Sequence, residues 1–303
     1  MLFNRENKGS EELNRLVGTF YASNNFATIE GELVAAENEL SHLVGPEVIR
    51  LARDKYSAYE DDDLVDAVRL PVALLAISRW SAQMDVSHED SGRKKKLDDN
   101  EKMPFEWMID RDDRAMRERY YRALDALYEH LEANNIEQWR KSPVRMLQEE
   151  CIVRSLDDFE AVFPIEHSHY VFYLMASLMV ETQRLEVRKL FGDRWQLVTS
   201  ADPDKDLLSI ARGLVVLSSV VKAVKRWSIS VFPLEIARRF SPSYQGNRQT
   251  KAAETKEIDW YVDSLEKQIR GLKQEAHSLL GSASSDVRLL PENSRDRKFF
   301  TVV

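Results

Sequence analysis

Three motifs occur twice in this chain, and both sets come in the same order. Each set has a short run ending in Gly, then an apolar stretch that opens on Asp-Leu and closes on Arg-Trp-Ser. A Trp-containing run with two acids follows. The matching runs are residues 42–45 and 189–192, 63–69 and 206–212, 79–81 and 226–228, and 105–110 and 258–263. The shared order predicts that one helical unit has been duplicated.

The spacing inside the two copies supports the same interpretation. Arg69 and Trp80 of the first copy are four residues closer together than Arg212 and Trp227 of the second. Four residues make about one helical turn, so such an insertion nearly preserves the buried face of a helix. The unit is far longer than a solenoid repeat, and we therefore expect two domains instead of a repeat array.

Composition limits the fold to helical bundles. The 303 residues fit two ordinary domains, and a hydrophobic content of 43% is enough for real cores. Only 10 Gly and 9 Pro are present, which disfavours turn-rich sandwiches and barrels. We predict an all-α protein of two tandem, similar helical-bundle domains, 1–145 and 146–303. Minor β-strand content is expected in the loops and in the extended C-terminal tail, at 299–303.

Apolar periodicity gives the expected elements. A polar stretch reaches to about Asn25, and residues 134–156 should form a packed or partly helical connector. Pro71 should kink or split the helix that contains it. Helix starts are expected after the acidic run 60–63 and after residues 200–203. The expected helices cover residues 29–43, 46–56, 64–81, 105–133, 168–190, 206–228 and 257–280.

Charge and cysteine content narrow the environment and the partners. The net charge of -8 argues against a general nucleic-acid coat, which needs a basic field. The single cysteine, Cys151, cannot form an internal disulfide, so we expect a reducing, cytoplasmic location. The N-terminus does not have the apolar run of a secretory signal. The most hydrophobic segments, 170–180 and 214–224, are short for a bilayer, so we expect core helices and no membrane contact.

The sequence offers no constellation that dictates a reaction. It has no phosphate loop, dinucleotide fingerprint or nucleophile elbow, and we expect no enzyme activity, no cofactor, no metal and no small-molecule substrate. His167 and His169 are interpreted as part of a polar loop entering a helix, in preference to a metal site. A weaker alternative is a metal-dependent hydrolase. It would use the residues Glu106, Asp110, Asp113 and His88.

Four tryptophans occupy repeated positions. Trp80, Trp107, Trp227 and Trp260 lie beside Leu, Ile or Val at helical spacing. They could stack on nucleic-acid bases, but buried aromatic rings dominate packing energetics. We interpret them as anchors in the core or at interfaces.

Each copy places a long basic loop between its last two helices. Loops beyond about 12–15 residues are uncommon in compact domains unless they are functional or disordered. Composition is compatible with two interpretations of these loops. They are solvated and mobile, or they are arms that reach a neighbouring subunit or weakly contact a polyanion. The candidate interaction residues are Arg93, Lys94, Lys95 and Lys96 in the first loop and Arg238, Arg239, Arg248 and Lys251 in the second.

The order of these motifs resembles a known helical family. It runs from the Leu43-Val44-Gly45 stop and the acidic cap, through the helix closing on Arg-Trp-Ser and an extended segment before Gly92, to residues 105–110 and a long Leu-rich helix. This order is similar to that of an uncharacterised family encoded in prophage-like regions of Bacteroidetes. That family resembles the small head-to-tail connector (adaptor) proteins of tailed phages. The likeness covers most of 25–140 and, more loosely, 160–280.

The resemblance implies a virion structural protein that forms oligomers at the portal end of a capsid. Its partners would be further copies of itself and portal or tail proteins, and it would have no catalytic residues. Connectors usually have a single short domain, whereas this chain is tandem, which leaves the ring stoichiometry open. The alternative from a different class is a cytoplasmic helical scaffold that binds another protein in a groove between helices.

Overall fold

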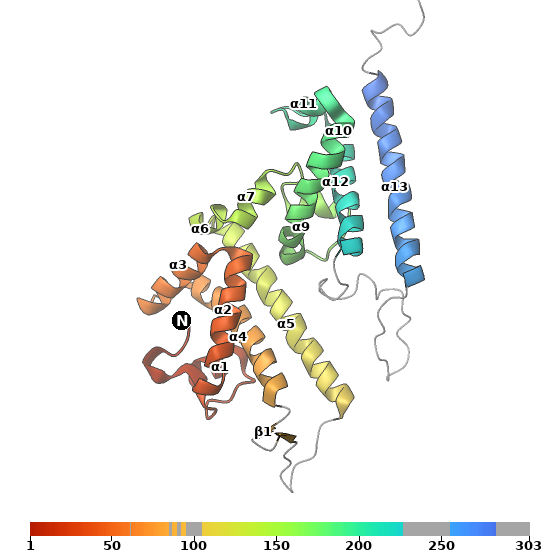
Figure 1. Ribbon diagram of the computed structural model, residues 1–303. Coiled ribbons are helices and arrows are strands. Elements are labelled where there is room, and N and C mark those ends of the chain that lie inside the picture. Colours follow the sequence, from red (N-terminus) through yellow and green to blue (C-terminus); the bar gives the residue numbers. More distant parts are fainter. Residues whose placement is uncertain (61, 85–86, 90–91, 95–104, 227–254, 283–303) are drawn as a thin grey trace, which may run out of the picture.

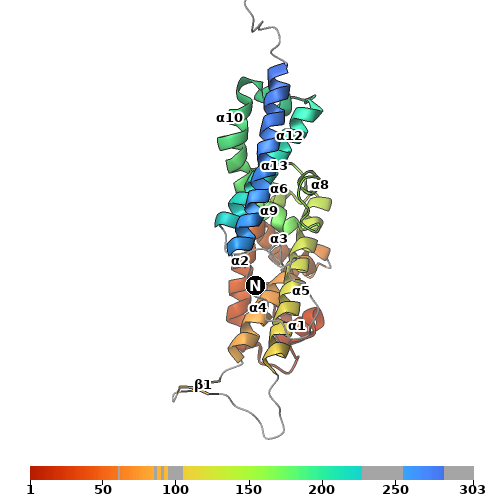
Figure 2. The ribbon, with the colours of Figure 1, turned by 90° about the vertical axis from the view of Figure 1, so that its right-hand side faces the viewer.

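A computed structural model describes residues 1–60, 62–84, 87–89, 92–94, 105–226 and 255–282, and this part of the chain is helical apart from one hairpin. The helices form an elongated molecule with α1 to α5 toward one end and α9 to α13 toward the other (Figures 1 and 2). The all-α class predicted from the sequence is therefore confirmed.

The first part of the chain consists of η1 (Arg5–Asn7), α1 (Gly9–Val17), η2 (Phe26–Thr28), α2 (Glu30–Val44), α3 (Pro46–Ser57), α4 (Asp63–Met84), β1 (Ser87–Glu89), β2 (Gly92–Lys94) and α5 (Glu106–Ala133). The remainder consists of α6 (Glu137–Arg140), α7 (Pro143–Glu149), α8 (Leu156–Glu160), α9 (His169–Thr182), η3 (Gln183–Val187), α10 (Arg188–Phe191), η4 (Gly192–Trp195), α11 (Gln196–Thr199), α12 (Lys205–Arg226) and α13 (Thr255–Ser282). The predicted domain boundary between residues 145 and 146 falls inside α7, and the division into two domains stays a prediction.

Gly and Pro residues set the helix ends where the sequence predicted them. Gly45 has a φ of +94°, which a residue without Cβ adopts easily, and Pro46 then opens α3 at its first position. Gly192 likewise ends α10 with a φ of +55°. The connector at 134–156 is partly helical, as expected, because α6 and α7 lie within it.

The N-terminal prediction was wrong. The segment up to Asn25 is not a plain polar stretch: it contains η1 and α1, and it buries Leu2, Phe3, Leu13 and Phe20. Within the segment, Leu13, Leu16 and Val17 recur at helical spacing and form the apolar face of α1. Burial of a few large side chains fixes the segment against the bundle.

Two further expectations need correction. Of the two outcomes expected at Pro71, a split helix is wrong, since α4 runs unbroken through it from Asp63 to Met84, and a kink stays a prediction. The start of α12 is capped by Asp204, whose Oδ1 accepts the N–H groups of Asp206 and Leu207 at 3.0 Å each, and not by the preceding Ser200-to-Pro203 run as a whole.

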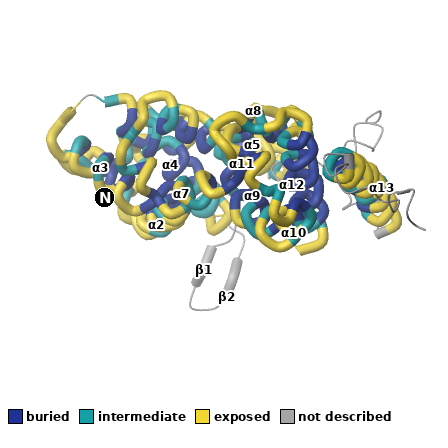
Figure 3. The backbone as a smooth tube through the Cα atoms, turned by 90° about the horizontal axis from the view of Figure 1, so that it is seen from above, coloured by how far each residue is buried: buried dark blue, intermediate teal, exposed yellow. Residues whose placement is uncertain are grey.

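Two central helices organise the packing. α4 packs against α1, α2, α3 and α5, and α12 packs against α8, α9, α11 and α13. Figure 3 shows dark blue, buried backbone concentrated around these two helices. α12 is long and apolar enough to cross a membrane by length and composition, but 72% of that stretch is buried inside the protein. It therefore has the burial pattern of a core helix.

An arginine early in α4 ties the N-terminal segment to the bundle. The Arg69 Nε–H donates to the carbonyl oxygen of Leu2 at 2.9 Å, and the same guanidinium forms an ion pair with Glu12 of α1. The Glu12 carboxylate also accepts the backbone N–H of Arg5 at 2.8 Å. One carboxylate therefore joins the central helix to the chain segment that precedes α1.

The arginine at the matching position of α12 makes the same set of contacts. The Arg212 Nε–H donates to the carbonyl oxygen of Ile152 at 3.1 Å, and its guanidinium pairs with Asp158 of α8 at 2.7 Å. The Asp158 carboxylate also accepts the backbone N–H of Arg154 at 3.1 Å. Again one carboxylate joins the central helix to the segment that precedes a short helix.

The far ends of the central helices are clamped in matching ways. Arg79 of α4 forms two hydrogen bonds with the Glu39 carboxylate of α2, at 2.7 and 2.8 Å. Arg226 of α12 forms two with the Glu181 carboxylate of α9, at 2.6 and 2.9 Å. The hydrogen bonds from Arg226 lower the pKa of Glu181 to about 2. Bidentate pairs of this kind fix orientation as well as distance.

Candidate assembly surface

The free ends of α4 and α5 expose large apolar side chains at the end of the molecule that carries the hairpin (Figures 1 and 2). The exposed fractions are 55% for Met84, 67% for Phe105, 53% for Trp107 and 41% for Met108. We call these four residues the tip. Single exposed apolar residues are ordinary, but several large ones at one end of a monomer mark interaction sites.

The start of α5 projects from the core. From Phe105 to Ala115, no residue whose side chain the structure describes is buried, and burial begins at Met116. The first turn of α5 follows Phe105, whose backbone is extended and whose side chain does not cap the helix. Acidic residues and arginines alternate along the turns that follow. Helical turns that bury so little apolar surface gain little stability from packing, and short helices are marginal in water. Contact with another surface would stabilise them.

A hairpin follows the C-terminal end of α4. β1 and β2 pair antiparallel, with His88 opposite Arg93 and Ser87 opposite Lys94. The backbone of this hairpin includes two candidate interaction residues, Arg93 and Lys94, and Figure 2 shows β1 extending away from the ends of α4 and α5. Lys95 and Lys96 lie outside the described residues.

The second predicted loop cannot be assessed in the same way. Arg238, Arg239, Arg248 and Lys251 all fall between residues 227 and 254, outside the described part of the chain. The expected short strand at 299–303 also falls outside it. The role of both basic loops stays a prediction.

The repeated tryptophans do not share one environment. Trp80 packs against the core, with its ring 5.0 Å from that of Phe20 and its Nε1–H donating to Thr28 at 3.2 Å. Trp107 at the tip and Trp260 in the first turns of α13, 64% exposed, are not core residues. Trp227 lies outside the described residues. The core interpretation therefore holds for Trp80 and is wrong for the two long-helix tryptophans, which stay candidates for interface anchors.

The histidine pair enters a helix, as the sequence predicted. Ser168 caps α9 by accepting the Val171 N–H at 3.2 Å. The neighbouring His167 turns away from the helix and places its Nδ1 2.8 Å from Glu160. Within the described residues, no group of three or more His, Cys, Asp or Glu could hold a metal ion. Of the four residues of the hydrolase alternative, His88 and Glu106 have side chains that the structure does not describe.

The single cysteine is buried and free of any disulfide. Burial raises the pKa of the Cys151 thiol to about 11, so the thiol stays protonated at neutral pH. A buried neutral thiol behaves as a small apolar side chain, and Cys151 fits a packing role in the connector.

A polar seam, formed by Asp125 and Glu132 of α5 with their partners, joins α5 to α9 and was not predicted from the sequence. Asp125 of α5 accepts the Ser168 hydroxyl at 3.0 Å and the Tyr170 N–H at 2.9 Å. Burial raises the pKa of Asp125, while the two hydrogen bonds act in the opposite direction. The carboxyl of one helix thus caps the first turn of another.

One helical heptad further along α5, Glu132 completes the seam. Its Oε1 accepts Nε1–H of Trp139 at 2.7 Å, Nε–H of Arg145 at 2.8 Å and the hydroxyl of Tyr173. Glu132 therefore holds together α5, α6, α7 and α9. The signal in the sequence was a pair of acids seven residues apart on one helix face, next to a leucine stripe.

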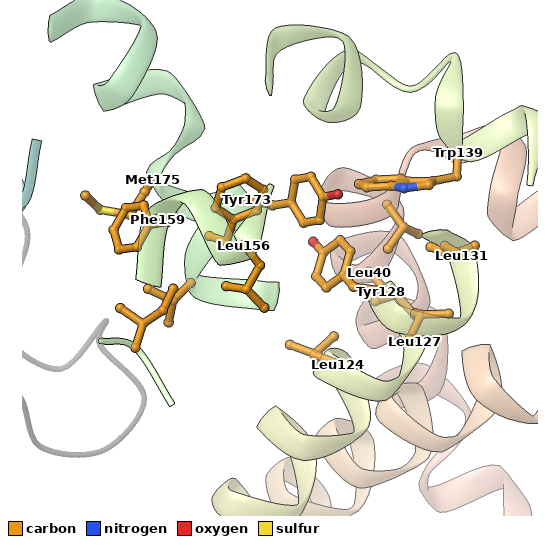
Figure 4. Packing of buried hydrophobic residues seen from close by; sticks show 14 of the residues in the cluster. Leu40, Leu124, Leu127, Tyr128, Leu131, Trp139, Leu156, Phe159, Tyr173 and Met175 are labelled. Carbon is orange, nitrogen blue, oxygen red and sulfur yellow. The ribbon is translucent and has the colours of Figure 1, made fainter. Parts of the chain in front are cut away.

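Aromatic rings pack around this seam. The Tyr128 ring lies 5.0 Å from that of Tyr173 and 5.3 Å from that of Trp139, and the Trp139 and Tyr173 rings meet edge-on at 4.9 Å. Figure 4 shows these three side chains converging between the leucines of α5 and the residues near α8 and α9. Edge-on ring pairs add to the stabilisation from area burial. The outer face of α5 is therefore covered near its C-terminus and bare near its N-terminus.

Comparison with known proteins gives one match. Residues 37–146 match the model of a family of unknown function (DUF6712), which is less than half of the chain. The matched segment runs from within α2 into α7 and includes the tip and the seam residues of α5. No curated protein and no solved structure matches the chain. The match agrees with the expected likeness to an uncharacterised family over this segment, and it does not extend to a phage role.

Proposed function

We propose that this protein is a non-enzymatic structural component that assembles into oligomers, and that it serves as a head-to-tail connector in a phage-like particle. The observation that carries the assembly role is the tip, where α5 extends three turns beyond the core with exposed Phe105, Trp107 and Met108. Trp is enriched among the residues that contribute most to protein interfaces. The partners would be further copies of the chain and portal or tail proteins.

The proposal includes an internal duplication, which would provide two similar frames in one chain: α1 to α5 around α4, and α8 to α13 around α12. It is supported by the matched partners of α4 and α12 and by the matched arginines Arg69 and Arg212. Each arginine bonds a backbone carbonyl before a short helix and a carboxylate within that helix. Helical packing alone does not require such agreement in hydrogen-bonding partners.

The particle role rests on the helix order. The stop at Gly45, the central helix closing on Arg-Trp-Ser and the long α5 follow the order that connector-like families share. A hairpin next to exposed helix ends would give each subunit an arm for its neighbour. The basic residues of that arm, Arg93 and Lys94, suit weak contact with a polyanion.

Size-exclusion chromatography with light scattering tests this proposal. Full-length protein and a variant lacking residues 86–101 would be compared up to high concentration. We expect full-length protein to form assemblies of several 35.1 kDa chains, and the deletion to weaken them. A strict single-chain mass for both proteins at every concentration would refute self-assembly.

Two other outcomes would redirect the assignment. Capture of a cytoplasmic host protein by a monomeric chain would favour the scaffold alternative. Bound metal in the purified protein, together with a thermal shift on adding Mn²⁺ or Mg²⁺, would favour the hydrolase alternative.

A further inference from the structure

The last helices of the two frames are held differently. α5 packs on α4 by one face and on α9 by another, and Asp125 and Glu132 tie it to the second frame. Among the described elements, α12 is the one on which α13 packs extensively, and Figure 3 shows exposed backbone on the side of α13 away from α12. α5 is therefore locked between two partners, whereas α13 is attached along one side.

The attachment of α13 is a well-formed apolar face. Val262, Leu265, Ile269 and Ala276 are buried at heptad-like spacing against α12. Gly213 of α12 lets α13 approach closely. A Cβ at that position would lie 3.0 Å from Leu272.

An ion pair marks the other end of the same interface. Lys225 of α12 places its Nζ 2.8 Å from Glu266 of α13. Without α13, the valine-rich side of α12 would be exposed to water, which is strongly unfavourable for so apolar a helix. The second frame is therefore incomplete unless some copy of α13 covers α12.

The chain between the two helices is long. Twenty-eight residues, 227–254, separate α12 from α13. A chain of that length can span up to roughly 90 Å when extended, more than twice the length of α12. The covalent connection therefore allows α13 to reach the α12 of a second molecule.

We propose that α13 is exchanged between copies in the assembled state, so that the α12 of one protomer is covered by the α13 of its neighbour. This inference rests on the proposed self-assembly. Exchange conserves every contact of the α12–α13 interface, so it links protomers without a new surface, which makes it a low-cost route to oligomers. The first frame cannot do the same, because the seam holds α5 in place.

Site-directed crosslinking tests the exchange. Two chains would carry Cys151→Ser with either Lys225→Cys or Glu266→Cys, on tags of different size, and would be co-expressed. A short bismaleimide can then join residue 225 to residue 266 only between chains. We expect a covalent species that contains both tags, because these side chains face each other across the interface.

A double-cysteine chain provides the second arm. Lys225→Cys with Glu266→Cys on one Cys151→Ser chain should give crosslinked products of at least twice the 35.1 kDa chain mass. The matched pair Glu39→Cys with Arg79→Cys, across α2 and α4, should crosslink within the chain only. That control also reports whether the crosslinker is active and the fold intact.

The outcomes separate the two proposals. An assembly whose double-cysteine chain crosslinks only internally, with no mixed-tag product, would overturn helix exchange and leave the proposed function standing. A chain that stays monomeric by light scattering while it crosslinks internally would overturn both.

Discussion

Glu132 is the residue on which the junction of the two frames depends. It accepts three donors, and one of them belongs to the fully buried Trp139. Glu132→Ala would leave the indole N–H and the Arg145 guanidinium without this acceptor. We expect the free energy of unfolding to fall by about 1–3 kcal/mol, the cost of stranding buried donors.

Urea unfolding followed by circular dichroism measures this loss. The matched control is Glu129→Ala, an exposed glutamate on the same helix, which should change stability by less than about 0.5 kcal/mol. Equal effects of the two substitutions would show that Glu132 does not hold the junction.

Glu181 makes stability depend on pH. Its pKa is lowered to about 2 by the hydrogen bonds from Arg226, with Lys222 adding to the effect. A depressed carboxyl pKa stabilises the fold above the unfolded-state pKa, and this contribution disappears as the pH falls through the folded-state value. We expect the melting temperature of the protein to fall between about pH 4.5 and pH 2, partly because of this group.

Glu181→Gln is the test for this contribution. The variant should be less stable than wild type at pH 6, and the difference should narrow steadily toward pH 2. If the melting temperatures of wild type and variant change with pH in parallel from pH 6 to pH 2, the Glu181 ion pair contributes nothing to folding.

At the scale of elements, the proposed duplication can be compared position by position, and its two copies then differ by about one helical turn. Ten positions separate Arg69 from Arg79 and fourteen separate Arg212 from Arg226, so the second central helix gains four residues between its matched arginines. The helix that packs beside the central helix is also longer in the second copy, where α9, η3 and α10 correspond to α2. Glu39 lies six positions before Gly45, and Glu181 lies eleven before Gly192.

Under the proposed duplication, four residues are added in the central helix but five in the helix beside it, and the π-helix η3 accounts for this difference. Four added residues complete about one α-turn, but a fifth would rotate all following side chains by about 100°. A π turn has i→i+5 hydrogen bonds and so absorbs one additional residue. η3, at Gln183–Val187, lies between the Glu181 clamp and the Gly192 stop, where this residue must be accommodated.

Deleting one exposed residue of η3 tests this interpretation. Removal of Leu185 should convert the π turn to regular α-helix and leave the melting temperature within a few degrees of wild type. Removal of Ser177, an exposed residue in α9, should be much more harmful because it misplaces buried Leu178 and Met179. Thermal melts followed by circular dichroism compare the two. Equal destabilisation would contradict the insertion account.

Helices with long apolar stripes could be predicted from the sequence, and so could the shorter α3 with its Gly45 and Pro46 signals, whereas α1 and the single-turn helices could not. α2, α4, α5, α12 and α13 have periodic patterns with Gly, Pro or acidic ends, and they lie where those signals predicted. α1 was missed although Leu13, Leu16 and Val17 recur at helical spacing, because this stripe is short and lies among charged residues. η3 was missed because a π turn continues the helix around it and needs no Gly, Pro or capping residue.

The candidate site was predictable in outline only. The sequence identified the repeated tryptophans and the basic loops, but hydrophobic spacing could not separate the partly buried Trp80, which packs on the core, from the exposed Trp107. That difference depends on where α4 ends relative to α5. The seam was missed because Asp125 and Glu132 look like the solvated face of an amphipathic helix until α9 is placed against them.

At the scale of the whole molecule, the two frames share one continuous core and meet through α5 and α9. The seam occupies the C-terminal half of α5, and the exposed N-terminal turns of that helix lie at the opposite end. In the proposed assembly, this exposed apolar end would contact neighbouring subunits.

Sedimentation velocity over a range of concentrations tests assembly through the tip most directly. It would compare wild type, a tip variant with Phe105→Ser and Trp107→Ser, and a control with Leu197→Ser, an exposed leucine of α11 at the other end of the molecule. We expect wild type and the control to sediment as assemblies, and the tip variant as single 35.1 kDa chains with an unchanged melting temperature. A tip variant that assembles as wild type does, or a wild type that stays a single chain at every concentration, would contradict the account.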